Sequence, residues 1–323
     1  SRCQREGRGF ESHCPLQNIV IKSKFLTSVF QKLLTDKDIR YFKGKFTYYL
    51  IFRFIRNFLK NDLIVQIYNF KIFGSINKKK TSYFLLKKCE FGDYHELSMI
   101  KKMSNKYKIF FLDCGCNYGF YSFYVASLAK HNLIISIEAS KKTSEEFLKN
   151  NDLNNFSNIV FYNKAISNSD GDNIEFNESQ NDWESSQTHK DFKLATVTKI
   201  DTVKIDTLIK KYDFIDYQTI IKLDIEGNEM KAIDGALEFI QKTSPIIIIE
   251  FSKYIFDKKS NIEYLKNFLK KYNYLIYDTN NNFFFLEDVL MKLKDLKKRH
   301  KTIGNYYLIK DTKKNLEDFL SNE

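Results

Sequence analysis

Glycines and carboxylates follow two apolar stretches of this sequence in a pattern suited to binding a nucleoside. The string DCGCNYG at 113–119 follows the apolar run IFFL, and Glu138 follows the run LIISI. Gly115 and Gly119 allow a sharp turn and a close approach of the backbone to a ligand. An acid that ends the next strand can accept hydrogen bonds from both hydroxyls of a ribose. These residues predict a nucleoside-containing ligand at the ends of two neighbouring strands.

The glycine spacing distinguishes two kinds of nucleoside ligand. A dinucleotide fingerprint reads G-x-G-x-x-G, and its glycines admit a pyrophosphate. Here Gly115 and Gly119 are spaced G-x-x-x-G, and Cys116 fills part of the space that a pyrophosphate needs. The carboxylate of Asp113 would repel phosphate, but it suits the cationic methionine group of S-adenosylmethionine. The string therefore favours S-adenosylmethionine over NAD as the cofactor.

A second charged string, KLDIEGNE at 222–229, follows a later apolar run. Side chains alternate along a strand, which predicts Lys222, Asp224 and Glu226 on one side. A carboxylate beside a methyl donor can take the proton of an acceptor hydroxyl, so we expect Asp224, ahead of Glu226, to act as a general base. Two other interpretations stay open. The two carboxylates could bind a divalent metal, but two carboxylates alone are too few ligands for a typical site, and we predict no metal. Alternatively, they could form an ion-paired strand end before a helix.

Strands and helices alternate from about residue 95, which predicts a doubly wound α/β fold with ligands at the carboxyl ends of a parallel sheet. Strands are expected at 109–113, 133–138, 159–165, 219–224 and 245–251, with later ones near 274–277 and 306–309. Helices are expected at 118–130, 141–150, 228–241 and 260–272. Ser260 and Glu263 have the spacing of a capping box at the start of the last helix.

Three motifs resemble those of the FkbM family of methyltransferases. DCGCNYGFYS at 113–122 is similar to the family's D-x-G-A-N-x-G-x-Y-S, EA at 138–139 to its E-P, and KLDIEGNEMKAIDGA at 222–236 to its K-x-D-x-E-G-x-E-x-x-V-L-x-G-A. Weaker similarity, which includes GDYHEL at 92–97, extends the resemblance over about 63–311. Cys116 and Ala139 stand where the family usually has Ala and Pro. The resemblance implies a Rossmann-like, seven-stranded class I methyltransferase sheet that binds S-adenosylmethionine.

The resemblance also assigns residues to the cofactor. They share a position at the carboxyl ends of the first three strands: Asp113, Gly115, Asn117, Gly119, Tyr121, Ser122, Glu138, Ala139, Asn163 and Ala165. The first six would line the methionine end, Glu138 would hold the ribose, and Asn163 and Ala165 would lie near the adenine.

Three carboxylates are the expected catalytic residues. Glu250 matches a glutamate that ends the fifth strand in the family, and it joins Asp224 and Glu226. The serines at 185–186 match small hydroxyl residues of the family. His189 in the same loop is a further candidate base, although a lone loop histidine is more often incidental.

The resemblance implies methyl transfer to a hydroxyl of a sugar, glycan or related small molecule, because the family acts mostly on sugars and natural-product oxygens. Two alternatives stay open. An RNA methyltransferase is favoured only by the net charge of +12, and no appended RNA-binding module is evident, so nucleic acid is not the expected partner. An inactive binding module is the second, but the intact acids Asp113, Glu138, Asp224 and Glu226 argue against it. The oligomeric state is not indicated.

We expect four parts in the chain, from its composition, its pattern of strands and helices, and the family resemblance. Residues 1–17 are rich in Gly, Arg and Cys and resemble translated tRNA-gene DNA, which predicts a non-native or disordered leader. Residues 18–94 are expected to form an N-terminal helical and β-strand extension, and 95–311 the methyltransferase domain. Residues 312–323 are expected to be a C-terminal tail.

Within the extension, helices are expected in 24–60 and short strands at 63–73 and 82–86. The aromatic and basic segment 46–60 is expected to dock on the main domain, with contact to a membrane surface as the alternative. No apolar run is long enough to span a membrane, and the five cysteines have no metal or disulfide spacing. These features predict a cytoplasmic protein, membrane-peripheral at most.

Overall fold

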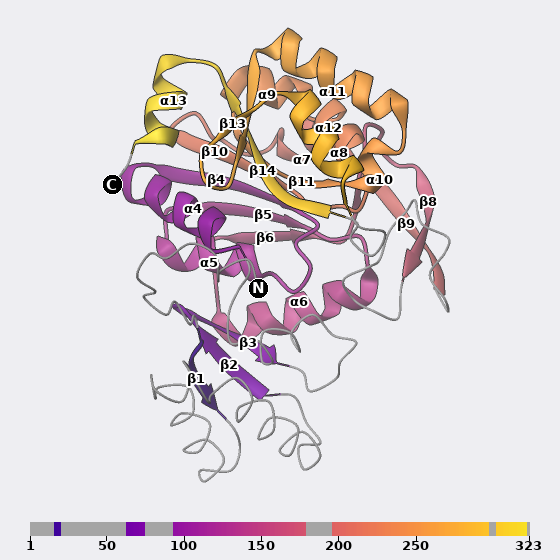
Figure 1. Ribbon diagram of the computed structural model, residues 1–323. Helices are drawn as coiled ribbons and strands as arrows, with labels where there is room; N and C mark the ends of the chain where they lie inside the picture. The colour runs from indigo at the N-terminus through magenta and orange to yellow at the C-terminus, as the bar shows by residue number, and fades with distance from the viewer. Residues whose placement is uncertain (1–15, 21–62, 75–92, 179–195, 297–301, 322–323) are drawn as a thin grey trace, which may run out of the picture. The chain divides into compact units, whose positions relative to one another are not determined.

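The chain forms two compact units, residues 1–92 and 93–323. A computed structural model describes residues 16–20, 63–74, 93–178, 196–296 and 302–321 (Figure 1). In the first unit, three strands form an antiparallel sheet in chain order: β1 (Leu16–Val20), β2 (Leu63–Ile67) and β3 (Phe70–Gly74). The expected strand at 63–73 is therefore two strands, and the chain reverses between them at Tyr68, where φ is 48°. β1 begins at Leu16, inside the segment marked by composition as a leader.

Several sequence predictions concern residues outside the described ranges: residues 1–15 of the leader expected at 1–17, the helices in 24–60, the segment 46–60, the strand at 82–86, the serines at 185–186 and His189. In the part of the chain that the structure does describe, no helix is both long and apolar enough to cross a membrane.

The second unit is built on an eight-stranded sheet with the order β13-β12-β14-β11-β10-β4-β5-β6. Its strands are β4 (Lys108–Cys114), β5 (Leu133–Ile137), β6 (Ile159–Tyr162), β10 (Tyr217–Leu223), β11 (Ile246–Ser252), β12 (Tyr274–Asp278), β13 (Phe283–Phe284) and β14 (Thr302–Lys310). The five strands from β6 to β11 in that order are parallel, and β14 is antiparallel to both of its neighbours. This sheet confirms the expected α/β fold, and the eighth strand is the two-residue β13.

The strand order creates a switch point between β4 and β10. The chain leaves β4 towards β5 and β6 on one side and returns to β10 on the other. In open α/β sheets, ligands bind outside the carboxyl ends of the strands at such a point. The loops that follow β4 and β10 are therefore where a fold of this class is expected to bind its ligand.

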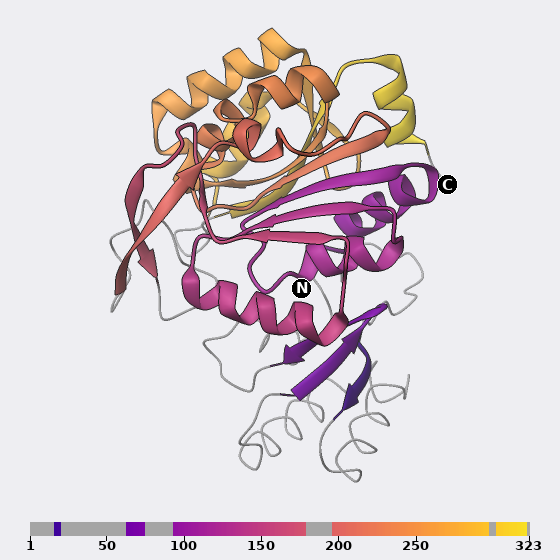
Figure 2. The same cartoon turned by 180° about the vertical axis from the view of Figure 1, so that it is seen from behind.

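Helices cover both faces of this sheet, as Figures 1 and 2 show. One face carries α4 (Tyr94–Lys106), α5 (Phe120–Leu128), α6 (Lys141–Asn154) and α13 (Lys313–Leu320). The other carries α7 (Ile205–Ile209), α8 (Glu229–Asp234), α9 (Leu237–Thr243), α11 (Lys259–Tyr272) and α12 (Leu286–Lys294), and the short α10 (Lys253–Phe256) follows β11. A smaller sheet, in the order β7-β9-β8, consists of β7 (Ala165–Ile166), β8 (Asn173–Glu178) and β9 (Thr196–Val203).

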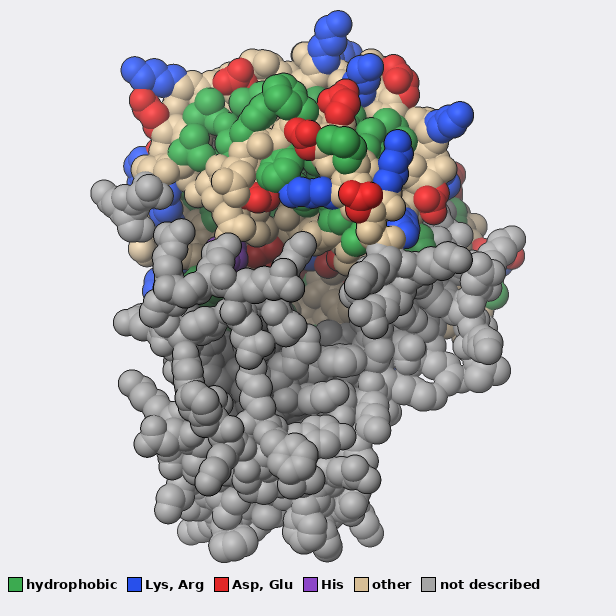
Figure 3. Space-filling view, viewed as in Figure 1, with side chains coloured by type: hydrophobic (Ala, Val, Ile, Leu, Met, Phe, Trp, Pro, Cys, Tyr) green, Lys and Arg blue, Asp and Glu red, His purple; other side chains and the backbone are tan. Residues whose placement is uncertain are grey.

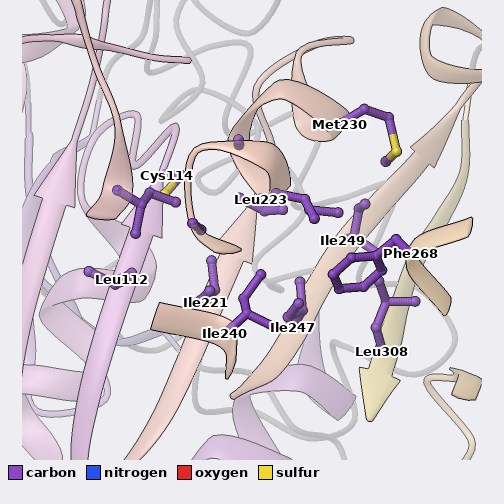
Figure 4. Packing of buried hydrophobic residues seen from close by; sticks show 14 of the residues in the cluster. Leu112, Cys114, Ile221, Leu223, Met230, Ile240, Ile247, Ile249, Phe268 and Leu308 are labelled. Atoms are coloured by element: carbon purple, nitrogen blue, oxygen red, sulfur yellow. The ribbon is translucent and has the colours of Figure 1, made fainter. Parts of the chain in front are cut away.

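The apolar core lies between the sheet and the helices α8, α9 and α11. Figure 4 shows side chains of the central strands meeting those of the helices: Leu112, Cys114, Ile221, Leu223, Ile247, Ile249 and Leu308 from the sheet, and Met230, Ile240 and Phe268 from the helices. Burying one large aliphatic side chain contributes roughly 1.5–3 kcal/mol. The alternating positions Asp113, Lys222 and Glu250 lie on the opposite face, because successive side chains of a strand point to opposite sides. The core thus fixes the strands that carry these polar residues.

The predicted single helix at 228–241 is wrong, because the chain breaks between α8 and α9. A Cβ at Gly235 would lie 2.2 Å from the carbonyl oxygen of Ser167, so the backbone passes close to β7 there. The carboxylate of Asp206 accepts hydrogen bonds from the amides of Glu238 and Phe239 at 3.0 and 2.9 Å. This external cap starts a new helix, which the sequence of the helix itself does not indicate.

Two other local predictions were wrong. The strand expected at 159–165 ends at Tyr162 and resumes as β7, because Asn163 turns its side-chain amide towards the loop after β5. The capping box at Ser260 and Glu263 is absent, since Lys258 is the N-cap of α11 and both residues lie within the helix.

The C-terminal helix α13 packs on the domain. Phe319 is buried against the rings of Tyr277 and Tyr307, with centroids 5.4 and 5.1 Å away. Asp318 accepts a hydrogen bond from the hydroxyl of Tyr107 at 2.8 Å and pairs with Lys106. The segment expected to be a tail therefore includes a helix that holds the C-terminal end of α4.

Candidate functional site

The loop after β4 has no unbonded backbone amide from 115 to 119. Gly115 N and Cys116 N donate to Ile137 O (2.9 and 3.0 Å), Asn117 N to Glu138 Oε2 (3.0 Å), Tyr118 N to Asn117 Oδ1 (2.8 Å) and Gly119 N to Cys116 O (2.8 Å). A pyrophosphate is held by such amides in dinucleotide-binding loops. Because these donors are already used, the loop is poorly suited to a dinucleotide.

The two loop glycines are required by contacts within the protein. Gly115 has a φ of 81°, and a Cβ there would lie 2.0 Å from the carbonyl oxygen of Asp224. Gly119 has a φ of 87°, and a Cβ there would lie 2.5 Å from the ring of Phe123 and 2.7 Å from that of Phe147. A close approach to a ligand was the expected reason for both glycines. In the structure, Gly115 also brings the loops after β4 and β10 into direct contact.

Glu138 organises the loop after β5. Its two carboxylate oxygens accept hydrogen bonds from the amides of Asn117 (3.0 Å) and Ser140 (2.8 Å). Burial raises the pKa of Glu138 to about 7, although these two hydrogen bonds oppose the shift. The side-chain amide of Asn163 donates to the backbone oxygens of Glu138 (2.8 Å) and Ala139 (3.1 Å). Glu138, Ala139 and Asn163 are therefore brought together, and Ala165 starts β7 two residues further on.

Asp113 lies beneath the loop and is almost fully buried. Ser122 Oγ donates to Asp113 Oδ2 at 2.5 Å and lies 2.7 Å from Ser136 Oγ. The other carboxylate oxygen, Oδ1, is buried and has no hydrogen-bond partner. Burial raises the pKa of Asp113, and the positive charge of Lys222 opposes this shift. Ser122 itself is fully buried, so it supports Asp113 from below.

Lys222 is a buried cation in the centre of the site. Its Nζ lies 2.8 Å from Asp224 Oδ2 and 4.8 Å from the ring centroid of Tyr121. Lys222 is also the partner of Asp113 in the pairing of β10 with β4. Burial lowers the pKa of Lys222, but the negative charges of Asp224 and Asp113 outweigh burial and the pKa is raised. The lysine therefore stays charged and links the two acids.

Two acids at the start of α4 join this cluster, and sequence reasoning missed them. Tyr121 Oη donates to Asp93 Oδ2 at 2.8 Å, and Asn305 Nδ2 donates to Glu96 Oε1 at 2.7 Å. Burial raises the pKa of Glu96 to about 7, with the charge of Asp93 adding to the shift. The string GDYHEL was the available signal, since Asp93 is the N-cap of α4 and Glu96 lies in its first turn.

Glu250 lies on the same face, one strand further. It pairs with Asn305 across β11 and β14. Burial raises the pKa of Glu250 to about 8, and the negative charge of Asp224 raises it further while Lys222 opposes the shift. A carboxyl group with this pKa is mostly protonated at pH 7 and half ionised at about pH 8, so it can act as a proton acceptor under mildly alkaline conditions.

The alternation of side chains expected through Glu226 stops at the turn after β10. The strand ends at Leu223, and Glu226 adopts the left-handed conformation with a φ of 53°. The alternation argument therefore holds for Lys222 and Asp224 but was wrong for Glu226, whose place is set by the turn. Glu229, which was given no role from sequence, accepts hydrogen bonds from the amides of this turn.

The described residues contain no group of three or more His, Cys, Asp or Glu side chains arranged to hold a metal ion. The acids instead bond to hydroxyls, amides and a single buried lysine. The arrangement can hold a cationic ligand beside the loop after β4 and accept a proton at the end of β10.

Comparisons with known proteins extend this description. Residues 113–276, half of the 323-residue chain, match the family described as the methyltransferase FkbM domain. No curated protein matches the chain.

Three solved structures are similar to this chain. An FkbM methyltransferase from Methylobacillus flagellatus KT is 20% identical with a TM-score of 0.39, and the match covers 70% of this chain and 52% of that one. TYW2 from M. jannaschii in complex with AdoMet is 14% identical (TM-score 0.39; 78% and 84% covered), and a putative rRNA-methylase from Clostridium thermocellum is 13% identical (TM-score 0.38; 67% and 93% covered). The chain thus spans about half the length of the first of these proteins.

The family match covers all three sequence motifs, from Asp113 through the end of the string at 222–236. It confirms the expected family, the methyltransferase class and the S-adenosylmethionine cofactor that the family implies. The chain therefore belongs to the FkbM family of methyltransferases.

Proposed function

We propose that this protein transfers the methyl group of S-adenosylmethionine to a hydroxyl oxygen of a sugar, glycan or related small molecule. The observation that carries the proposal is the position of Asp224. Its side chain is 40% exposed, it is held by the buried Lys222, and its backbone lies directly against Gly115 of the loop after β4. A partly exposed carboxylate is therefore fixed next to the loop after β4, where the methyl donor is expected.

The electrostatics of the site suit a cationic donor. Asp113 and Glu138 lie below and beside the loop after β4, and all amides of that loop from 115 to 119 are engaged. S-adenosylmethionine carries a sulfonium and an ammonium group, whereas NAD carries a pyrophosphate that needs free donors.

The proposed reaction is a direct displacement. The acceptor oxygen attacks the methyl carbon, the carbon–sulfur bond breaks, and the bond electrons remain on sulfur as the neutral thioether. The protein mainly holds the two atoms in line, which reduces the entropic cost of the reaction. The hydroxyl proton goes to a carboxylate, for which Asp224, Glu226 and Glu250 are the candidates.

RNA is the alternative acceptor, because the net charge is +12. On the face shown in Figure 3, however, basic and acidic side chains are interspersed over the described surface. A continuous basic surface is the usual footprint of an RNA-binding protein. We therefore favour a small-molecule or glycan hydroxyl.

The proposal is tested by incubating the protein with methyl-labelled S-adenosylmethionine and a panel of sugars, glycans and cell extract, followed by mass spectrometry. We expect labelled methyl ethers, and a loss of product in Asp224→Asn but not in Asp216→Asn, an exposed aspartate outside the site. Label only on RNA, or equal product from both variants, would contradict the proposal.

A further inference from the structure

The turn between β10 and α8 carries both Asp224 and Glu226, and the buried side chain of Glu229 bonds to its backbone. We propose that Glu229 is a positioning residue, whose carboxylate holds this turn in the conformation that presents Asp224 and Glu226 to the acceptor. The inference deepens the proposed function and rests on it for its catalytic consequence.

The carboxylate of Glu229 accepts hydrogen bonds from two backbone amides of the turn. The amide of Ile225 donates to Oε1 at 3.2 Å, and the amide of Gly227 donates to Oε1 at 3.1 Å and to Oε2 at 3.0 Å. Hydrogen bonds to an ionised acceptor are stronger than those between neutral groups. Glu229 is 1% exposed, so it acts from beneath the turn and is screened from solvent.

The backbone of the turn needs such a restraint. Glu226 and Gly227 both have positive φ, 53° and 102°. An L-residue in the left-handed region is disfavoured, and such a conformation persists only where the surroundings fix it. Glu226 stands between the two amides that Glu229 holds. Glu229 therefore fixes the part of the turn in which the strained residue lies.

Asp224 is held independently of Glu229. Its amide donates to the carbonyl of Cys114 at 3.2 Å, and its carboxylate pairs with Lys222. The first half of the turn is thus fixed by the sheet and the second half by Glu229. Loss of Glu229 should release residues 225–227 while leaving the strand, the loop after β4 and the donor site in place.

The variant Glu229→Gln tests this division. Glutamine keeps the shape of glutamate, but one of its two ends is an NH₂ group that cannot accept a hydrogen bond. In the native protein, Oε1 and Oε2 both accept hydrogen bonds from backbone amides. In either orientation of the glutamine, its NH₂ group would therefore face a backbone N–H group of the turn. Glu229→Asp keeps the charge but shortens the side chain, and it should restore part of the function.

The experiment combines three measurements at pH 8 on the full chain. Mass spectrometry follows hydrogen exchange of peptides covering 222–232, calorimetry measures S-adenosylhomocysteine binding, and labelled S-adenosylmethionine gives kcat and KM. In Glu229→Gln we expect faster exchange in this segment, donor affinity within about threefold of wild type, and a kcat lower by on the order of 10²-fold. The exchange rate and kcat of Glu229→Asp should lie between those of the wild type and those of Glu229→Gln. The matched control Glu238→Gln, an exposed glutamate of α9, should leave all three unchanged.

The outcomes separate this inference from the proposed function. Unchanged exchange at 222–232 in Glu229→Gln would overturn the role of Glu229, as would faster exchange with a wild-type kcat. An equal loss of donor affinity and kcat would show a general structural role instead. Should Glu229→Gln fail to fold, Glu229→Asp with fully wild-type exchange and kcat would also overturn it. If the wild-type protein methylates no hydroxyl at all, the proposed function fails, while the exchange data still decide whether Glu229 holds the turn.

Discussion

Nζ of Lys222 lies 2.8 Å from Oδ2 of Asp224, and the two side chains differ sharply in exposure: the lysine is 4% exposed and the aspartate 40%. A buried cation thus anchors an accessible carboxylate at the end of β10. On its other sides the same lysine faces the ring of Tyr121 and the charges of Asp113 and Asp93. Lys222 therefore connects β4 just before its loop, the start of α4 and the proposed catalytic turn.

Replacement of Lys222 by Met should strongly destabilise the protein. The methionine fills similar space but leaves Asp113 buried without a counter-charge, and breaking a buried pair from one side costs about 3–5 kcal/mol. Urea denaturation at pH 8 measures this change. Asp224→Asn should cost less, because Asp224 is partly exposed. Equal losses in the two variants would contradict the central role of the lysine.

Gly115→Ala should disrupt the site, and Gly171→Ala provides a matched control. Both glycines have positive φ, 81° and 78°, but a Cβ at Gly171 has no atom within 4 Å. The control should lose only the cost of the left-handed conformation, roughly 1–2 kcal/mol. Gly115→Ala should lose more stability and also donor affinity, because its Cβ would collide with Asp224 O. Thermal denaturation and calorimetry measure both effects, and indistinguishable variants would refute the loop contact.

The free energy of unfolding should fall as the pH rises from about 5 to about 7. Burial raises the pKa of Glu96, Glu138 and Glu229 from 4.5 to about 7, so the folded protein keeps protons that the unfolded chain has released in this window. Stability decreases with pH wherever the folded state binds more protons. We expect a loss on the order of 1–3 kcal/mol in urea titrations, and a smaller loss in Glu96→Gln. A rise in stability across this window would show that these glutamates are ionised throughout.

The methyl-transfer rate should rise with pH and level off above about pH 8 if Glu250 accepts the proton. Its pKa is raised to about 8 by burial and by Asp224, and only the ionised form is a base. Glu250→Gln should remove this pH dependence and lower kcat by roughly 10²–10⁴-fold with donor binding retained. An unchanged profile in Glu250→Gln would assign the proton to Asp224 or Glu226, which the corresponding Asn and Gln variants distinguish.

Much of the fold follows from local sequence signals. The continuous apolar runs at β4, β10 and β11 predicted strands that are buried on both faces of a sheet. The glycines of 113–119 and the acids that follow the apolar runs marked the carboxyl ends of the strands. The positions of Asp113, Glu138 and Asp224 could thus be predicted. The break before α9 could not, because Asp206, which caps that helix, lies in another element.

The details of the site depended on contacts between distant segments. Nothing near Glu96 in the sequence indicates that Asn305 donates to it, since the two residues are 209 positions apart and meet only in the folded chain. The reason for Gly115 was also hidden, because the atom that excludes a side chain there is the carbonyl of Asp224. Glu229 stood within a recognised motif, yet its role required the left-handed turn at Glu226 to be seen.

Isothermal titration calorimetry of the wild-type protein with S-adenosylhomocysteine and with NAD tests the central claim most directly. The account predicts one-to-one binding of S-adenosylhomocysteine, no heat with NAD, and an affinity roughly ten- to hundredfold weaker in Glu138→Ala, which loses a charged hydrogen-bond partner. Binding of NAD, no binding of S-adenosylhomocysteine, or an unchanged affinity in Glu138→Ala would contradict a methyl-donor site formed by the loops after β4 and β5.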